Sequence, residues 1–410
     1  MKRFFSILIA SLGGFQFGYN TSVISGALLF LAKDFSLTAW EEGIAASIIL
    51  LGALLGASLG GSLANRLGRI GAQKGAALFF IVGAVSIFFS KNLDTFLLGR
   101  FIQGFGVGVV SMVAPMYLAE IAPSRRRGFY VSTNQLAVTI GIFIAYLVNL
   151  IFAKQEDWRF IFGVGVVPAI VYLVGLFFIP ESLSHQQEEL IHKTSWKSLK
   201  IWRFRKLLFI GIFLSVFQQI TGINIVIYFA PSIFEASGYS TSESAIFATL
   251  WLGLMNVIAT TFSLWLIDKV GRRPLLIASI IFMVLGLFVI ALGLYERIHV
   301  IEVLSFASLM IYIAAFAIGM GPIPWLIISE IYPLSIRGHA MSLATFANWL
   351  ANYFMALTFL DLVHLLSPSG AFFLYGCIGI VALFFILKRV PETKGKSLET
   401  LSKELKINLH

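Results

Sequence analysis

The sequence predicts an all-α membrane protein of twelve transmembrane helices in two six-helix bundles, and three observations support this prediction. Of the 410 residues, 58% are hydrophobic and only 12% are charged, whereas soluble domains are about 45–50% apolar and about 25% charged. Apolar runs of the roughly 20 residues that a membrane helix needs recur along the whole chain. In addition, the second half of the chain repeats short motifs of the first half.

Continuous apolar runs, separated by charged or turn residues, mark the expected helices. Because the runs do not alternate between apolar and polar residues with a period of two, they predict helices and not barrel strands. The first run is longer than the apolar core of a signal peptide, so we expect an uncleaved helix there. The runs lie near 4–32, 41–64, 75–90, 95–119, 128–153, 158–179, 207–234, 244–267, 275–296, 303–332, 339–365 and 369–388.

Lysine and arginine residues are concentrated in the loops on one side of this topology. If the N-terminus is cytoplasmic, the outer loops contain only Lys33, Lys91, Lys154, Arg159 and Arg297. The positive-inside rule therefore predicts that both termini are cytoplasmic. The net charge of +10 then comes from the basic cytoplasmic loops of a protein in a lipid bilayer. We therefore expect no nucleic acid as a partner.

The internal repeat has a nearly constant offset. Glu120 and Glu330 are 210 positions apart, as are Arg127 and Arg337, and Asn65 to Arg69 resembles Asp268 to Arg272 at an offset of 203. Two repeats of six helices have the same orientation in the membrane, which is typical of transporters with a central site between the halves. We expect bundles at 1–180 and 207–389, a short cytoplasmic loop at 181–206 and a cytoplasmic tail at 390–410.

The repeated motifs also predict one cytoplasmic charge cluster in each half. Each has a basic turn containing glycine, which can bring arginine close to acidic side chains and helix ends. We expect the clusters to hold the halves together when the outer side is open, although the basic residues could simply mark the cytoplasmic side. The cluster residues are Arg66, Arg69, Glu120, Arg127, Glu181, Asp268, Arg272, Arg273, Glu330, Arg337 and Glu392.

Amide side chains in several predicted membrane helices are the candidate substrate ligands. An amide in a membrane core is costly without a partner, and such groups often only join helices. Here they occur in many helices together with aromatic residues, and amides with aromatic faces suit a neutral polyol. Helical spacing puts Gln218, Thr221 and Asn224, or Gln219 with Tyr228, on related faces. The candidates are Gln135, Gln218, Gln219, Asn224, Tyr228, Asn256, Trp325, Asn348 and Trp349.

Charged side chains are missing from the middle of every predicted span, apart from Arg100 in the outer part of the fourth. Anionic, cationic and peptide substrates, a metal, a cofactor and catalysis at membrane depth are therefore all disfavoured.

The tenth span contains Gly321, Pro322 and Pro324, which must bend or break it. We expect a hinge that gates the site, with Trp325 over it; the alternative is a static kink.

Together these motifs resemble the sugar porters of the major facilitator superfamily over nearly all of the chain. The resemblance rests on segments 17–26, 99–101, 115–128, 218–224, 271–273 and 391–395. It implies the major facilitator fold, and it implies that Gln135, Gln218, Gln219, Asn224, Asn256, Trp325 and Asn348 contact the sugar. Trp349 is implied to line the same region, and Tyr228 is a weaker candidate.

Departures from the family pattern bear on the mechanism. Symporters of the family carry aspartate where this chain has Asn20, which we pair with Arg100 as the coupling position. An amide cannot usefully take up a proton, so we predict facilitated diffusion of a hexose or pentose. The alternatives are a sugar–proton symporter and a non-transporting sugar sensor. We expect a protein that functions as a monomer, in the inner membrane of a bacterium.

Overall fold

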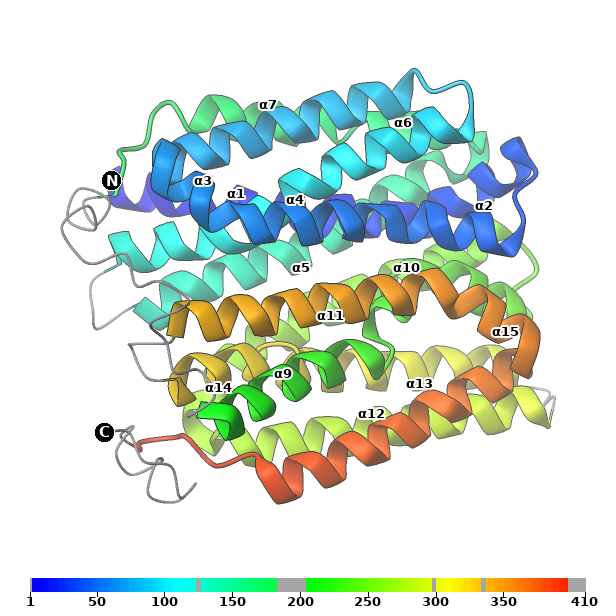
Figure 1. The fold of residues 1–410 in the computed structure, drawn as a ribbon. Helices are drawn as coiled ribbons and strands as arrows, with labels where there is room; N and C mark the ends of the chain where they lie inside the picture. Colours follow the sequence, from blue (N-terminus) through cyan, green and yellow to red (C-terminus); the bar gives the residue numbers. More distant parts are fainter. Residues whose placement is uncertain (1, 123–126, 183–203, 297–299, 333–336, 397–410) are drawn as a thin grey trace. The chain divides into compact units, whose positions relative to one another are not determined.

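The computed structural model describes residues 2–122, 127–182, 204–296, 300–332 and 337–396 (Figure 1). All regular elements within these ranges are helices. The first half contains α1 (Lys2–Ser22), α2 (Ile24–Phe35), α3 (Ala39–Phe88), α4 (Leu93–Ile121), α5 (Arg127–Phe152), η2 (Ala153–Gln155), α6 (Trp158–Gly163) and α7 (Val166–Gly175). The second half contains α9 (Arg205–Ile220), α10 (Ile223–Ala236), α11 (Ser242–Val270), α12 (Arg272–Tyr295), α13 (Ile301–Ala315), η4 (Phe316–Met320), α14 (Ile323–Ile331) and α15 (Arg337–Arg389).

The helices confirm the predicted set of membrane spans. Within the described residues, nine helical stretches are long and apolar enough to cross a bilayer. Two of these, α3 and α15, each contain two predicted spans and are broken in between, at Gly68 and at Ser367, where the backbone is not helical. With α1 and α2, which cover the first predicted span, the chain contains the twelve predicted spans.

The chain forms two compact units, each built from several segments. Unit 1 comprises Met1–Ile191, Asn224–Val257 and Tyr353–Leu365, and unit 2 comprises His192–Ile223, Ile258–Asn352 and Leu366–His410. The units therefore differ from the two sequence halves, because unit 1 includes two segments of the second half. The division into bundles at 1–180 and 207–389 stays a prediction.

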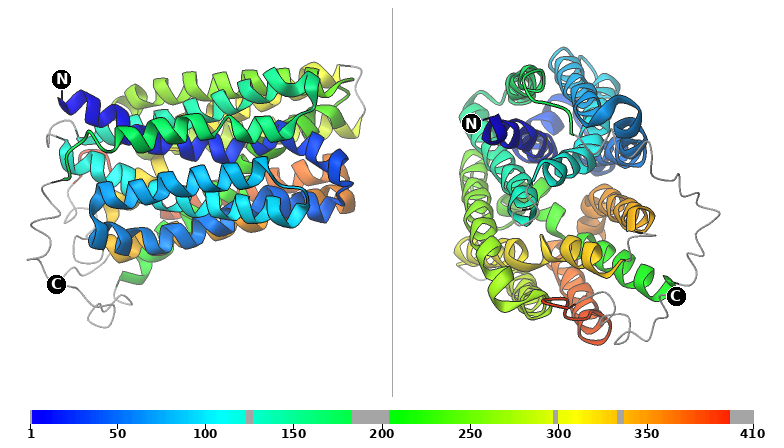
Figure 2. Two further views of the ribbon diagram at one scale, coloured as in Figure 1. Left: turned by 90° about the horizontal axis from the view of Figure 1, so that it is seen from above. Right: turned by 90° about the vertical axis from the view of Figure 1, so that its left-hand side faces the viewer.

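Helices α3 and α4 lie side by side in unit 1, and glycines bring them into close contact (Figures 1 and 2). A Cβ atom on Gly104 or Gly108 would overlap the carbonyl oxygen of Ile49 or Ala53 on α3. Gly52 and Gly56 of α3 face α4 in the same way. Both helices thus carry glycines four residues apart, the spacing that lets membrane helices pack backbone to backbone.

Unit 1 also joins helix ends that come from both sequence halves. A Cβ atom on Gly43 of α3 would overlap the carbonyl oxygen of Leu357 in α15. The Tyr146 hydroxyl of α5 donates a hydrogen bond to the Ile227 carbonyl of α10, at 2.8 Å. In the predicted topology the contact between Gly43 and Leu357 lies at the outer side of the membrane. The outer ends of the two halves are therefore in contact in this structure.

The seventh predicted span, 207–234, is not one continuous helix. α9 ends at Ile220 and α10 begins at Ile223, with Gly222 between them at a φ of +99°. That backbone conformation suits glycine because it has no Cβ atom. The helical spacing from which Gln218, Thr221 and Asn224 were predicted to lie on related faces is therefore interrupted at Gly222, and their common face stays a prediction.

The tenth predicted span is broken at its glycine and proline residues, as the sequence predicted. The π-helical segment η4 ends at Met320, and α14 begins at Ile323. Pro322 has no N–H to donate to the Ile318 carbonyl four residues earlier. The Ser263 hydroxyl of α11 donates to that carbonyl instead, at 2.9 Å. A side chain from another helix thus replaces a backbone hydrogen bond that proline removes.

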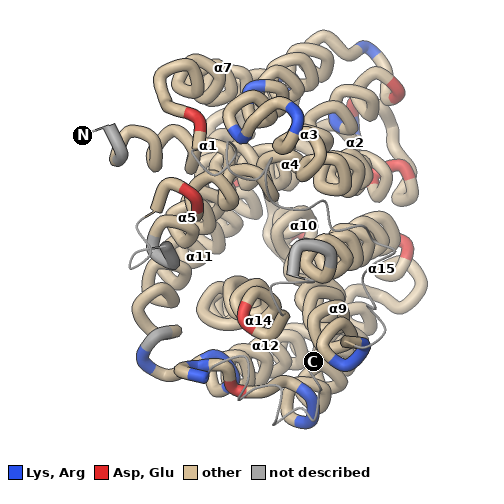
Figure 3. Tube along the Cα trace, turned by 60° about the vertical axis from the view of Figure 1, so that its left-hand side comes forward, with Lys and Arg blue, Asp and Glu red and all other residues tan. Residues whose placement is uncertain are grey.

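Charged residues mark the turns and helix ends on the face that Figure 3 shows, whereas the helix bodies are largely uncharged. The exposed large side chains include many apolar residues such as Phe177, Phe178 and Leu292, which are 67%, 72% and 60% exposed. A soluble surface rarely carries apolar patches of this extent. This distribution fits helices whose outer faces contact lipid.

The broken tenth span predicts an effect of removing the Ser263 hydroxyl. In Ser263→Ala the Ile318 carbonyl loses its partner, and an unsatisfied buried acceptor costs about 1–3 kcal/mol. We expect a lower midpoint of thermal unfolding in detergent. Ser58→Ala is the matched control, because the exposed Ser58 hydroxyl donates to the Leu54 carbonyl of its own helix and its loss should leave the midpoint unchanged. Equal midpoints for both variants would contradict this role of Ser263.

Candidate functional site

Three of the predicted substrate ligands form a hydrogen-bonded amide cluster in unit 2. Gln218 and Gln219 lie near the end of α9, and Asn348 lies on α15. The Gln219 Nε2 donates to the Asn348 Oδ1 at 3.1 Å, and the Asn348 Nδ2 donates to the Gln218 Oε1 at 2.9 Å. All three side chains are at least nine-tenths buried. The structure therefore brings together residues that are about 130 positions apart in the sequence.

The amide cluster is hydrogen-bonded directly to the break in the tenth span, where the sequence predicts a hinge. The Gln218 Nε2 donates to the carbonyl oxygens of Met320 at 2.9 Å and Gly321 at 2.8 Å. The Met320 carbonyl is the one that an N–H at position 324 would normally bond, and Pro324 has none. Gln218 therefore satisfies an acceptor that proline leaves free, besides facing Asn348 and Gln219.

The other predicted substrate ligands are divided between the two units. Trp325 on α14 is half-buried and Trp349 on α15 is buried, both in unit 2. In unit 1, Tyr228 and Asn256 are buried, while Asn224 and Gln135 are half-buried. That these side chains contact a sugar stays a prediction.

The predicted coupling position lies wholly within unit 1. The Asn20 Nδ2 donates to the backbone carbonyl and to the side-chain Oε1 of Gln16, both at 2.8 Å. The Arg100 Nη1 donates to the backbone carbonyl of Asn20 at 2.7 Å. Asn20 and Arg100 are thus in contact, through the backbone of Asn20.

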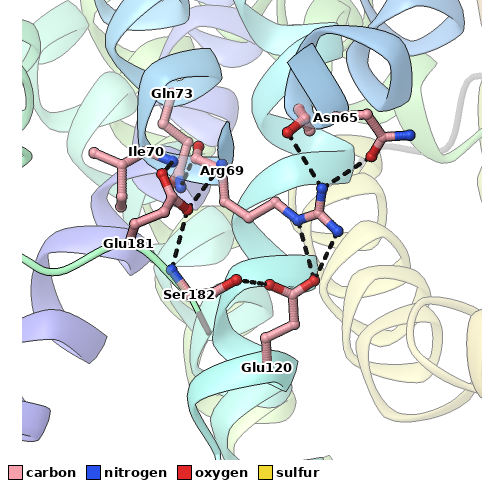
Figure 4. A network of polar contacts seen from close by, with 8 residues as sticks. Asn65, Arg69, Ile70, Gln73, Glu120, Glu181 and Ser182 are labelled. Atoms are coloured by element: carbon pink, nitrogen blue, oxygen red, sulfur yellow. Dashed lines mark hydrogen bonds and ion pairs between the residues drawn. The ribbon is translucent and has the colours of Figure 1, made fainter. Parts of the chain in front are cut away.

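The first charge cluster centres on the buried guanidinium of Arg69 (Figure 4). Its Nη2 and Nε lie 3.0 and 3.1 Å from the Glu120 Oε1. The backbone N–H groups of Arg69 and Ile70 donate to the two carboxylate oxygens of Glu181, at 2.9 and 3.0 Å. Gly68, at a φ of +79°, turns the chain so that these N–H groups begin a new helical segment. A carboxylate at a helix N-terminus is favourable because it accepts otherwise unpaired N–H groups.

The second charge cluster repeats this arrangement in unit 2. The Arg272 Nη2 lies 3.1 Å from the Glu330 Oε1. The N–H groups of Arg272 and Arg273 donate to the carboxylate of Glu392, at 3.1 and 3.0 Å. The preceding turn residue, Gly271, again has a positive φ, of +107°. The repeat seen in the sequence is therefore a repeat of hydrogen-bonded geometry.

The contacts of each cluster join helices of a single sequence half. Their predicted role in holding the halves together stays a prediction. Arg66 is exposed. The side chains of Arg127, Asp268 and Arg337 lie outside the described residues.

Several residues that complete these sites were not predicted. Ser182 donates to the Glu120 carboxylate, and Tyr117 donates to the Pro180 carbonyl at 2.7 Å. Ser279 donates to the Ala315 carbonyl at 2.7 Å and supports the π-helical segment. The sequence does not show which carbonyl group a serine in an apolar helix will bond to. Gln16 could have been found, because it lies four residues before Asn20 on the same helix.

Comparisons with known proteins agree with this architecture. The profile of the family described as "Sugar (and other) transporter" matches residues 6–189 and 183–405. The chain is 35% identical to the glucose transporter GlcP of Staphylococcus epidermidis, over 99% of this chain and 98% of that protein. It is 34% identical to the galactose–proton symporter of Escherichia coli K12, over 98% of this chain and 94% of that protein.

Solved structures match the fold over nearly the whole chain. A crystal structure of a D-xylose–proton symporter has a TM-score of 0.86 and 34% identity, covering 97% of this chain and 100% of that one. An inward-open conformation of the xylose transporter of Escherichia coli has a TM-score of 0.85 and 33% identity, covering 97% and 98%.

The second charge cluster predicts a pH dependence of stability. Partial burial opposes ionisation of the Glu392 carboxyl, but the backbone N–H groups of Lys394, Arg272 and Arg273 outweigh that effect and lower its pKa below the ordinary 4.5. A lowered folded-state pKa stabilises the fold above the ordinary pKa, and this stabilisation is lost as the pH falls through the folded-state value.

We therefore expect thermal stability in detergent to fall as the pH is lowered below about 4.5. Glu392→Gln should be less stable than the wild type at pH 7, with a flatter profile at acidic pH. Glu302→Gln, at the first turn of α13, is the control and should keep the wild-type profile. An unchanged profile in Glu392→Gln would contradict the assignment.

Proposed function

This chain belongs to the sugar transporter family of the major facilitator superfamily, and we propose that it carries a small neutral hexose or pentose across the membrane by facilitated diffusion. The family and fold predicted from the sequence are confirmed. The chain is an integral multi-pass membrane protein of a transporter family, not an enzyme. Bacterial relatives support its placement in a bacterial inner membrane.

The observation that carries the substrate proposal is the buried amide cluster of Gln218, Gln219 and Asn348. Each amide both donates and accepts hydrogen bonds, as sugar hydroxyls do. The Gln219 Nε2 lies 3.4 Å from the Gln218 Oε1, a long hydrogen bond that a sugar hydroxyl could replace. Because the groups in these contacts are neutral, the cluster favours a neutral polyol over an ion.

Alternating access requires that substrate binding and helix movement be coupled. Gln218 contacts the other two amides of the cluster and the carbonyls of Met320 and Gly321 at the hinge. A sugar hydroxyl that bonds to the Gln218 amide would compete with the hydrogen bonds from this amide to the broken helix. This arrangement supports the proposed gating role of Gly321, Pro322 and Pro324.

The proposal of facilitated diffusion rests on Asn20. Its amide nitrogen is fully used in hydrogen bonds to Gln16, and an amide does not titrate in the physiological range. Nothing at Asn20 itself could carry a proton across the membrane.

Sugar–proton symport is the second candidate, because relatives at similar identity are named as symporters for galactose and D-xylose. It would require a proton carrier other than Asn20. A proton gradient distinguishes the two mechanisms, since a facilitator only equilibrates its sugar and a coupled carrier accumulates it.

Uptake of labelled glucose, xylose and galactose into proteoliposomes, with and without an inward proton gradient, tests both parts of the proposal. We expect at least one sugar to equilibrate at a rate and to a level that the gradient does not change. Gln219→Leu should raise the sugar concentration that gives half-maximal transport about tenfold, which corresponds to a loss of about 1.4 kcal/mol of binding free energy. Thr358→Val, at an exposed position of α15, should leave transport unchanged.

The possible failures are distinct. Accumulation above the external concentration, abolished by collapsing the gradient, would contradict facilitated diffusion but leave the sugar proposal intact. Absence of uptake of all three sugars, from protein that is folded in the same membranes, would contradict the substrate class.

A further inference from the structure

Four polar side chains form a deeply buried cluster in unit 1, apart from the amide cluster of unit 2. Gln16 and Asn20 lie on α1, and Arg100 and Gln103 lie on α4. Their exposed fractions are 0%, 2%, 0% and 1%. This Arg100 cluster therefore places a cationic side chain where bulk water does not reach it.

The hydrogen bonds of the cluster leave more donors than acceptors. Through its Nη1, Arg100 donates to the Asn20 carbonyl at 2.7 Å and to the Gln103 Oε1 at 3.3 Å. The Arg100 Nε and Nη2 and the Gln16 Nε2 are buried and have no hydrogen-bond partner within the described structure. Buried donors without acceptors are rare in folded proteins, and each is costly.

Among the described residues, no acidic side chain forms an ion pair with Arg100. In the part of the chain that the structure describes, the ion pairs involve other arginines and lysines. The Phe162 ring centroid lies 5.2 Å from the guanidinium carbon of Arg100, and the Tyr228 hydroxyl is close enough to influence its charge. A cation–π contact of this kind offsets only part of the cost of leaving a buried charge without an opposite charge.

We propose that the Arg100 cluster binds a small monovalent anion, of which chloride is the simplest example. An anion accepts hydrogen bonds and donates none, so it matches the free Nε and Nη2 of Arg100. Its single negative charge would balance the single cation. Asn20 supplies no counter-charge, because its backbone carbonyl accepts from Arg100 and its neutral amide donates to Gln16. The anion can be a free ion or the carboxylate of a sugar acid.

Binding can be measured without transport, so this proposal and the proposed function fail separately. Purified protein is titrated with sodium chloride, with ionic strength held constant by the bulky sulfonate HEPES, and the midpoint of thermal unfolding is recorded. A ligand that binds only the folded state raises stability by RT ln(1 + [L]/Kd). We expect a saturable rise in the wild type and saturable binding of radioactive chloride.

Asn20→Asp is the decisive variant, because its carboxylate would supply the missing charge. Chloride should then neither raise the midpoint nor bind saturably. Arg159→Gln is the matched control. Arg159 is partly exposed and already has a counter-charge, because it forms an ion pair with Asp34 at 3.1 Å. The chloride response should therefore persist in this variant. Glucuronate in chloride-free buffer identifies the source, since it will replace chloride if the site accepts the carboxylate of a sugar acid.

Two results would overturn the proposal. One is a wild-type protein that neither binds nor is stabilised by chloride or glucuronate. The other is an undiminished chloride response in Asn20→Asp, which would place the anion elsewhere. Stabilisation by either anion that is lost in Asn20→Asp and kept in Arg159→Gln would support it.

Discussion

The hydrogen bonds to the carbonyl groups that Pro322 and Pro324 leave free are the interactions on which the second half of this transporter depends. In an apolar surrounding each free carbonyl needs a donor, because water is not available to supply one. Ser263 supplies it for Ile318 and Gln218 supplies it for Met320. The broken helix is therefore held by side chains of other helices. Such a segment can change its partners without unfolding, which is what the proposed hinge beside the amide cluster requires.

A second constraint acts at the charged ends of the helices, and both halves satisfy it in the same way. A glycine with positive φ starts a new helical segment, a glutamate accepts its first N–H groups, and an arginine of that segment pairs with another glutamate. Glu181 and Glu392 thus interact with backbone groups, whereas Glu120 and Glu330 pair with side-chain charges. This division of roles explains why two acidic positions recur in each half.

Much of the fold could be predicted from the sequence, because lipid demands long apolar helices and the duplicated motifs reveal the repeat. The breaks at Gly68 and around Pro322 follow from residues whose backbone preferences are strong. The break at Gly222 was missed because a single glycine in an apolar run does not reveal its φ. The amides of the candidate site were evident as costly residues in a membrane. Their partners, Ser215 and the carbonyls at the hinge, depend on contacts between helices that no local pattern contains.

The central claim is that Gln218 supports the broken tenth span, and hydrogen–deuterium exchange tests it most directly. Exchange of the peptide covering 316–331 would be compared between the wild type and Gln218→Leu, with the peptide covering 93–121 as an internal reference. The account predicts faster exchange in the hinge peptide of the variant and unchanged exchange in the reference. Equal exchange of the hinge peptide in both proteins would show that Gln218 does not hold the hinge, and would contradict the link between the amide cluster and gating.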